Sequence, residues 1–492
     1  MELYVSEFSK YIITLLIALD TYECFAVFRF SEEDRRRGIY TRQNLLMFAI
    51  HFTCFLVICF ETGDILYLFF YAFQQVILYA AIVLYRMLYP KANRLVVNNM
   101  CMLLSISFVM LTRLSYGKAL RQFIIVAVSL AVALVIPYFV HKFKFLKNLK
   151  WVYGIVGIAA LSVVLILGQT TYGSKLSYSI AGVTFQPSEF VKILFVFFVA
   201  SALYKASGFL EVLITAAVAG AHVIILVLSK DLGSALIFFV VYVLMVFIAT
   251  RNYLYLLAGA VGGSAAAYAA YLVFAHVQVR VQAWKDPWSV IDSAGYQITQ
   301  SLFAISSGGW FGLGLFKGTP ESIPFVEADF IFSAIAEELG IIFAVCLILI
   351  CVSCFIMFMN IAVRLNDKFY QLTAFGLGVI YIFQVFLTIG GGTKFIPLTG
   401  VTLPLISYGG TSVLTTLIMF SIIEGLYIIK QEEMQKQRLL QQKRQPRGKR
   451  RKSPRAEKGF GREEASPLEE TSPFDEEEGN EAEGSSEEFE ER

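Results

Sequence analysis

The segment that decides the fold runs from Arg280 to Gly340 and reads RVQAWKDPWSVIDSAGYQITQSLFAISSGGWFGLGLFKGTPESIPFVEADFIFSAIAEELG. It is rich in Gly, Pro, acidic and amide residues, whereas the sequence on both sides consists of long apolar runs. Asp329 directly precedes the apolar run FIF and therefore lies at the predicted mouth of a membrane helix. A carboxylate there is costly unless it is solvated or paired, so Asp329 is the first candidate for a functional residue.

The composition of the whole chain indicates a membrane protein. Of its 492 residues, 57% are hydrophobic and 44 are phenylalanine, which is far more apolar than a soluble domain. The 4 histidines are scattered and the 7 cysteines all lie in apolar runs, so the sequence predicts neither a metal site nor a redox pair. We therefore expect an all-α, polytopic membrane protein that binds no nucleic acid.

Apolar windows of spanning length predict about thirteen transmembrane helices. They lie near residues 9–30, 44–60, 65–85, 97–114, 123–141, 151–168, 190–205, 211–228, 232–250, 254–274, 330–361, 371–390 and 409–429. Lys and Arg gather in alternate loops, and loops rich in these residues stay in the cytoplasm. This pattern places the N-terminus outside, the C-terminus in the cytoplasm, and residues 275–328 outside as one large loop.

We divide the chain into three parts. Residues 1–90 form a predicted three-helix membrane module, and residues 91–430 form a predicted ten-helix core. Residues 431–492 are first basic and then acidic and contain few apolar side chains. This composition predicts a disordered cytoplasmic tail whose basic half contacts anionic membrane lipids.

Two polar clusters stand at the predicted outer ends of helices. In QPSEFVKI, which starts at Gln186, Glu189 and Lys192 share a helix face because they are three residues apart. Either this pair only satisfies itself, or Lys192 offers a cation to an anionic substrate group. In SKDLGSAL, Asp231 either caps the start of the next helix or takes part in catalysis.

A third cluster interrupts the apolar pattern near the C-terminus. Residues 388–414 read TIGGGTKFIPLTGVTLPLISYGGTSVL. Irregular backbone within a membrane survives only where it is buried in protein or lines a cavity. We therefore expect this segment to re-enter the membrane and form the floor of a site, with Lys394, Ser407 and Tyr408 as polar contributors. Transporters also use broken helices, so the segment alone does not separate an enzyme from a carrier.

Five motifs together resemble one known family. They are QPSEFVK, KDLGSAL, GYQITQS with SSGGWFGLGL, ADFIFSAIAEELG, and PLTGVTLPLISYGGTS. In this order and on one side of the membrane, they resemble the SEDS family of peptidoglycan glycosyltransferases, typified by RodA, FtsW and SpoVE. The resemblance covers roughly residues 97–430, so the first three predicted helices and the charged tail lie outside it.

The resemblance implies a function in the bacterial cytoplasmic membrane. Proteins of this family polymerise lipid II at the outer face, release undecaprenyl pyrophosphate, and serve cell elongation, division or sporulation. The implied partner is a class B penicillin-binding protein, which is a transpeptidase. The family's essential acid maps onto Asp329, its lysine and arginine positions map onto Lys192 and Arg280, and an acidic pair maps onto Glu337 and Glu338.

General chemistry leads to the same hypothesis. The attacking sugar hydroxyl needs a base within hydrogen-bond reach, and partial burial raises the pKa of a carboxylate such as Asp329 toward the working pH. The leaving pyrophosphate needs cations, which Arg280 and Lys192 can supply, and a divalent cofactor, Mg or Mn, is an option. Gln297 either contacts a sugar or lies on a helix surface. Asp329 is thus the predicted catalytic residue, and the candidate substrate-binding residues are Gln186, Glu189, Lys192, Arg280, Gln297, Glu337, Lys394 and Ser407.

Two other classes of function remain open at this level. A lipid II flippase would use the same cavity and buried charges, although a carrier needs a site near the midplane of the membrane and these polar groups gather at the outer face. A scaffold of the cell-wall synthesis machinery would use the tail for docking. Removal of residues 431–492 separates a scaffold from an enzyme.

Overall fold

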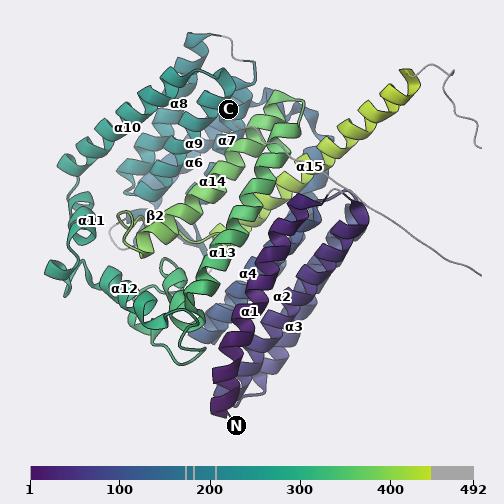
Figure 1. The fold of residues 1–492 in the computed structure, drawn as a ribbon. Helices are drawn as coiled ribbons and strands as arrows, with labels where there is room; N and C mark the ends of the chain where they lie inside the picture. Colours follow the sequence, from purple (N-terminus) through teal and green to yellow (C-terminus); the bar gives the residue numbers. More distant parts are fainter. Residues whose placement is uncertain (1, 31, 172–173, 181–182, 206–207, 445–492) are drawn as a thin grey trace, which may run out of the picture. The chain divides into compact units, whose positions relative to one another are not determined.

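Helices account for almost all of the secondary structure in the computed structural model (Figure 1). The structure describes residues 2–30, 32–171, 174–180, 183–205 and 208–444. The long helices are α1 (Glu2–Arg29), α2 (Glu33–Thr62), α3 (Leu66–Leu88), α4 (Arg94–Leu114), α5 (Tyr116–Lys142), α6 (Lys150–Leu167), α7 (Pro187–Leu203), α8 (Phe209–Leu228), α9 (Leu232–Thr250), α10 (Tyr253–Val273), α13 (Ile331–Arg364), α14 (Lys368–Gly392) and α15 (Gly410–Arg444). The described residues up to Leu439 form one compact unit.

Each predicted apolar window corresponds to one of these helices. Twelve helices in the described part of the chain are long and apolar enough to cross a membrane. The window at 190–205 corresponds to α7, which has 17 residues and is the shortest of the set. The all-α polytopic membrane fold is therefore confirmed. It has one small addition, a three-stranded antiparallel sheet between α6 and α7, formed by β1 (Gln169–Thr171), β2 (Ser174–Ile180) and β3 (Val183–Phe185).

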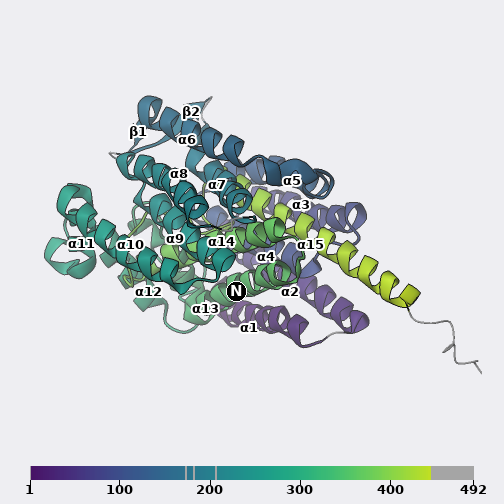
Figure 2. The ribbon, with the colours of Figure 1, turned by 90° about the horizontal axis from the view of Figure 1, so that it is seen from above.

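The core contains a helix, α4, that is buried on all sides. Every residue of α4 from Leu95 to Thr112 is buried, as expected for a helix with protein neighbours all round. Figure 2 shows α4 and α14 near the middle of the bundle, with α1–α3 and α8–α10 toward opposite edges. By contrast, none of the residues of α10 is buried, so this helix presents most of its surface to lipid.

Helix α13 is broken at Gly340, where the backbone has φ 89° and ψ 165°. The loop SSGGWFGLG, which precedes it in the chain, satisfies the backbone groups released by the break. Leu313 and Gly314 donate their N–H groups to the carbonyl oxygens of Glu337 and Glu338, each at 2.9 Å, and Ile341 N–H donates to Gly309 at 3.0 Å. The glycine-rich motif thus fixes the short first part of α13, which begins two residues after Asp329.

The large loop contains short helices, whereas the segment between α14 and α15 is irregular. The large loop contains α11 (Ala275–Lys285), α12 (Tyr296–Gly308) and two 3₁₀ turns, η2 (Trp288–Val290) and η3 (Pro320–Ser322). Residues 393–409, all of which are described, form neither a helix nor a strand. Lys394, Gly400 and Leu405 adopt positive φ values of 60°, 73° and 65° there, which sets the sharp path of the chain between α14 and α15.

The first residues of the predicted charged tail are helical in the structure. Helix α15 continues to Arg444, beyond the boundary at 431. Gln, Glu, Lys, Arg and Leu in this stretch are good helix formers, and contacts with the bundle hold its first turn. Glu432 accepts hydrogen bonds from Lys91 at 3.3 Å and His141 at 2.7 Å, and Glu433 accepts one from Asn366 at 2.8 Å. The rest of the predicted tail, residues 445–492, lies outside the described residues.

Candidate active site

The residues just before Asp329 are hydrogen-bonded to the irregular segment between α14 and α15. Ser407 Oγ donates to the carbonyl oxygen of Ala328 at 2.5 Å, and Tyr408 N–H donates to the carbonyl oxygen of Glu327 at 2.7 Å. The Glu327 carboxylate in turn forms an ion pair with Lys118 of α5. Segments far apart in the sequence therefore fix where the Asp329 side chain projects.

Asp329 and Arg280 lie beside two adjacent residues of that segment, Gly400 and Thr399 respectively. The Asp329 side chain is half-buried, and its Oδ2 would lie 3.9 Å from a Cβ placed on Gly400. Arg280 of α11 donates from Nη1 to the carbonyl oxygen of Thr399 at 3.4 Å. Burial raises the pKa of Asp329 to about 6, and the positive charge of Arg280 opposes this rise. Asp329 is thus a partly desolvated carboxylate within electrostatic range of a guanidinium, as the sequence hypothesis requires.

Asp231 lies within electrostatic range of Arg280 and acts as the N-terminal cap of α9. Its Oδ1 accepts a hydrogen bond from Ser234 N–H at 3.1 Å at the start of α9. Its Oδ2 accepts from Ser188 Oγ at 3.1 Å and from Gln186 Nε2 at 3.4 Å. Burial raises the pKa of Asp231, and these hydrogen bonds oppose the rise. The cap interpretation is confirmed, and Gln186 is held beside Asp231 at the start of α7.

Lys192 and Glu189 form a buried network instead of facing an open surface. Lys192 Nζ lies 2.9 Å from Glu189 Oε1 and 2.9 Å from Gln384 Oε1. Thr415 Oγ1 donates to the second oxygen of Glu189 at 3.2 Å. The side chains of Lys192 and Glu189 are only 5% and 8% exposed. This is the geometry of the self-satisfying pair, and a contact between Lys192 and substrate stays a prediction.

Glu337 is bonded to the loop before η3, and Glu338 is bonded to the end of α4. Glu337 accepts a hydrogen bond from Thr319 N–H at 2.9 Å. Glu338 is fully buried and pairs with Arg113 Nη2 at 2.8 Å. Glu337 lies eight residues beyond Asp329, a separation of about 12 Å along a helix. The structure therefore places the acidic pair in a separate network that supports the loop before η3.

The remaining predicted residues lie around the irregular segment. The Lys394 carbonyl oxygen accepts a hydrogen bond from Trp284 Nε1 at 3.2 Å, which ties α11 to this segment. Ser407 is buried, and its hydroxyl group already donates a hydrogen bond to the Ala328 carbonyl oxygen. Gln297 is half-buried on α12, one turn before Ser301, whose Oγ donates to the Gly392 carbonyl oxygen at 2.7 Å. Ser407 thus positions the Asp329 loop, while Gln297 retains exposed surface.

Three charged residues near the site were not predicted from the sequence. Arg113 and Lys118 lie at the facing ends of α4 and α5, where they pair with acids of the large loop. Lys230 is exposed and lies within electrostatic range of His276 on α11, which Arg280 also influences. The signal for Lys230 was its position directly before Asp231, whereas nothing local in the sequence indicates the partners of Arg113.

A cavity of about 400 Å³ lies beside the ion pair of Lys118 and Glu327. It is lined by Leu111, Leu114, Ser115, Lys118, Glu321, Ile323, Pro324, Phe325, Val326 and Glu327. Several of these residues belong to the loop that leads directly to Asp329. The candidate site therefore adjoins a space large enough for a polar headgroup or several sugar hydroxyls.

Solved structures share this fold. The crystal structure of the Thermus thermophilus rod shape determining protein RodA is 22% identical, with a TM-score of 0.53 over 68% of this chain and 96% of that chain. A chain from a structure described as the coordination of polymerization and crosslinking by a peptidoglycan synthase complex is 23% identical. Its TM-score is 0.59 over 70% of this chain and 99% of that chain.

Sequence relatives define the family. The family described as cell cycle protein, which comprises FtsW, RodA and SpoVE, matches residues 86–432. The peptidoglycan glycosyltransferase RodA of Mycobacterium tuberculosis is 32% identical over 333 residues, or 63% of this chain and 70% of the relative. The probable peptidoglycan glycosyltransferase FtsW of Aliivibrio salmonicida is 29% identical over 350 residues, or 67% of this chain and 85% of the relative. The resemblance of the five motifs is thus confirmed, and the chain belongs to the FtsW, RodA and SpoVE family, also called SEDS.

Proposed function

We propose that this protein is a membrane-embedded peptidoglycan glycosyltransferase that polymerises lipid II into glycan strands at the outer face of the bacterial cytoplasmic membrane. The names of its relatives support this activity. The observation that carries the proposal is the half-buried Asp329 beside Gly400, within electrostatic range of Arg280, which is bound to Thr399. No other described acid combines partial exposure, a desolvated environment and a nearby cation in this region.

Asp329 is the proposed general base. With a pKa of about 6 it is mostly ionised at neutral pH, yet it is more basic than a solvated carboxylate. It takes the proton of the acceptor 4-hydroxyl, whose oxygen forms a bond to the donor's anomeric carbon with inversion. The bond from that carbon to the pyrophosphate oxygen breaks, and undecaprenyl pyrophosphate leaves with the electron pair.

Cations near Asp329 stabilise the leaving group. Arg280 carries a permanent positive charge beside Asp329, and the exposed Lys230 adds a second charge in the same region. Developing negative charge on a pyrophosphate is stabilised strongly by preorganised cations in a partly dry site. We assign this role to Arg280 first, because Lys192 is already neutralised by Glu189.

A divalent ion is a separate proposal. Within the described ranges, no group of three or more His, Cys, Asp or Glu side chains is placed to hold a metal ion. The protein side chains there do not form a metal site of their own, so we derive no step through one. A Mg or Mn ion would have to be held largely by the substrate pyrophosphate, and activity measured with and without a chelator tests this.

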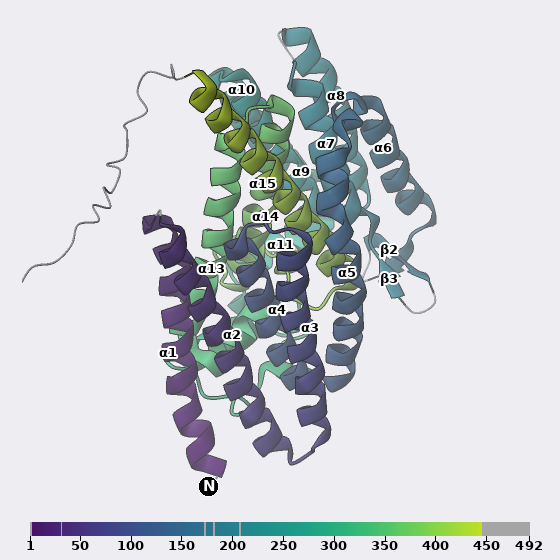
Figure 3. The same ribbon diagram turned by 90° about the vertical axis from the view of Figure 1, so that its right-hand side faces the viewer.

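The partner and the orientation follow from the same proposal. The related synthase complex is described as combining polymerization with crosslinking, which supports a class B penicillin-binding protein as the partner. We propose that the N-terminus lies outside and the end of α15 in the cytoplasm. The basic loops support this, and Figure 3 shows the start of α1 at the same end of the bundle as the connection from α2 to α3, which contains no Lys or Arg. Most of the three-helix module at residues 1–90 precedes the residues that match the family. The match therefore assigns no role to this module.

The test is lipid II polymerisation by purified protein, with Asp329→Asn beside wild type. Asp292→Asn is the matched control, because Asp292 is an exposed acid of the same loop. Wild type and the control should make glycan strands, and Asp329→Asn should make none. Strands from Asp329→Asn would refute the role of Asp329. Scrambling of lipid II in liposomes without any strands would identify a flippase, and loss of activity on removal of residues 445–492 would favour a scaffold.

A further inference from the structure

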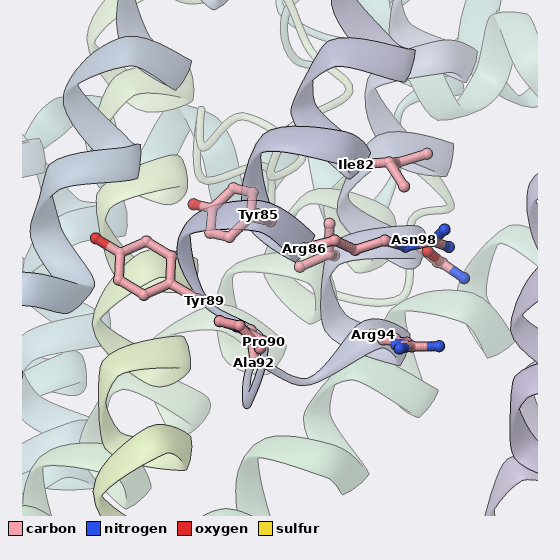
Figure 4. A pocket seen from close by; sticks show the side chains of 9 residues that line it. Ile82, Tyr85, Arg86, Tyr89, Pro90, Ala92, Arg94 and Asn98 are labelled. Atoms are coloured by element: carbon pink, nitrogen blue, oxygen red, sulfur yellow. The ribbon is translucent and has the colours of Figure 1, made fainter. Parts of the chain in front are cut away.

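A polar pocket, shown in Figure 4, lies where α3 is connected to α4. It has a volume of about 90 Å³ and is lined by Ile82, Tyr85, Arg86, Tyr89, Pro90, Ala92, Arg94, Val97 and Asn98. These residues come from the end of α3, the connecting loop and the start of α4. Helix α4 has 21 residues and is about 30 Å long, so the pocket and Arg113 lie near opposite membrane boundaries.

A larger apolar cavity adjoins this pocket. It has a volume of about 520 Å³ between α2 and α3, and it shares Ile82 and Arg86 with the polar pocket. Its other lining residues are Thr41, Asn44, Leu45, Phe48, Gln75, Val76 and Tyr79. The two cavities form one groove, which is apolar between the helices and positively charged at its end.

The described residues leave the positive charge at the end of the groove without an ion pair. Among the described residues, no carboxylate lies within 4.0 Å of Arg86 or Arg94, although Arg42 and Arg113 both have such partners. The two guanidinium groups repel each other. In Figure 4, the polar ends of Arg86, Arg94 and Asn98 point to the same side of the loop, whereas Tyr85 and Tyr89 point to the other.

A buried acid beside this loop, Glu424, does not fill this role. Glu424 of α15 accepts a hydrogen bond from Asn93 N–H at 2.7 Å, next to Arg94 in the chain, and forms no ion pair with either arginine. An independent feature lies in the apolar cavity, where Asn44 Oδ1 is buried without a hydrogen-bond partner. A buried amide oxygen without a donor is costly, which indicates that a ligand or water donates to it.

We propose that this groove binds one anionic phospholipid of the inner leaflet, with its phosphate between Arg86 and Arg94 and an acyl chain along Leu45, Phe48 and Val76. Basic pockets between membrane helices on the cytoplasmic side suit anionic headgroups. The loop YPKANR belongs to the basic loops that the charge pattern places in the cytoplasm. A free phosphate would satisfy the arginines but would leave the adjoining apolar cavity without an occupant.

This site is independent of the proposed catalysis. It lies mainly on the three N-terminal helices and contains none of the residues assigned to glycosyl transfer. Bound lipid would join α2, α3 and α4 at the inner boundary and would stabilise the attachment of this module to the core. Binding and stability are therefore the proper readouts, and they do not depend on enzymatic activity.

The experiment uses the full chain, purified in detergent and titrated with dioleoylphosphatidylglycerol or dioleoylphosphatidylcholine. A thiol-reactive dye reports unfolding through buried cysteines such as Cys54 of α2 and Cys101 of α4. Native mass spectrometry counts the bound lipids. The test variant is Arg86→Gln/Arg94→Gln. The charge-matched control is Arg35→Gln/Arg37→Gln, which removes two exposed arginines of α2 that already pair with Glu32 and Glu33.

Phosphatidylglycerol should raise the melting temperature of wild type and of the control, and phosphatidylcholine should not. The double variant should bind phosphatidylglycerol about 30-fold more weakly, because two basic contacts are lost. Leu45→Trp, which fills the groove and keeps both arginines, should also lose bound lipid, and it decides the question if the double variant does not fold. Unchanged binding by either variant, an equal shift with phosphatidylcholine, or the same shift from inorganic phosphate alone would overturn the proposal.

Discussion

Arg113 donates from Nε to Oε1 of Glu338 at 2.9 Å, although the two residues are 225 positions apart in the chain. Their side chains are 7% and 0% exposed. Arg113 also contacts Glu321 at 2.5 Å and lies over the ring of Phe316 at 4.4 Å from its centroid. This one arginine therefore joins the end of α4, the loop before η3 and the short first part of α13 that follows Asp329.

Replacement of Arg113 alone should strongly destabilise the protein. Arg113→Met leaves the carboxylate of Glu338 buried without its partner, and breaking a buried pair in this way costs about 3–5 kcal/mol. Arg113→Met/Glu338→Met should recover most of the loss, because no buried charge then remains unpaired. Thermal unfolding followed with the thiol-reactive dye measures both, and a wild-type melting temperature for the single variant would contradict this prediction.

The polymerisation rate should fall as the pH drops below about 6. A general base is active only when deprotonated, and burial raises the pKa of Asp329 to about 6. The acid limb of the rate profile should therefore lie well above the ordinary pKa of an aspartate. Initial rates between pH 4.5 and 8 measure it. The Asp292→Asn control should keep the same limb, and a rate that is constant over this range would argue against Asp329 as the base.

Removal of the Arg280 charge should move this acid limb to higher pH. Arg280 opposes the rise in the Asp329 pKa, so Arg280→Gln should raise that pKa further. The same variant should lower the rate by about 100-fold, since the leaving pyrophosphate loses a preorganised cation. Arg280→Lys should restore the position of the limb. A slower variant with an unmoved limb would separate Arg280 from Asp329 and assign it to substrate binding alone.

Gly312 should not tolerate even the smallest side chain. It adopts φ 79°, and a Cβ there would collide with the carbonyl oxygen of Glu338. Gly312→Ala should therefore destabilise the protein by about 1–3 kcal/mol and lower polymerisation, because the break in α13 loses its fitted loop. Gly262→Ala on α10 is the matched control, since nothing lies within 4 Å of its Cβ position. Equal melting temperatures for the two variants would contradict the fit between loop and helix.

The helices themselves were predictable from the sequence. A segment that crosses a bilayer must form all its backbone hydrogen bonds internally and present apolar side chains to lipid. Its local composition is therefore enough to predict it as a helix. Lys192 and Glu189 were also predictable as neighbours, because a spacing of three residues fixes their shared face in any helix. The extension of α15 to Arg444 was not predicted, since its supporting contacts with Lys91, His141 and Asn366 come from distant parts of the chain.

The sequence by itself thus determined the membrane class, the order of the helices, the family and the position of Asp329 at the mouth of a helix. The tertiary structure alone decided which groups meet. Arg280 lies within electrostatic range of Asp329 because Arg280 is bound to Thr399 and Asp329 lies beside Gly400, and Arg113 reaches Glu338 because α4 and α13 are packed together. Hydropathy depends on each residue alone, whereas an ion pair or a groove depends on the spatial arrangement of segments hundreds of residues apart.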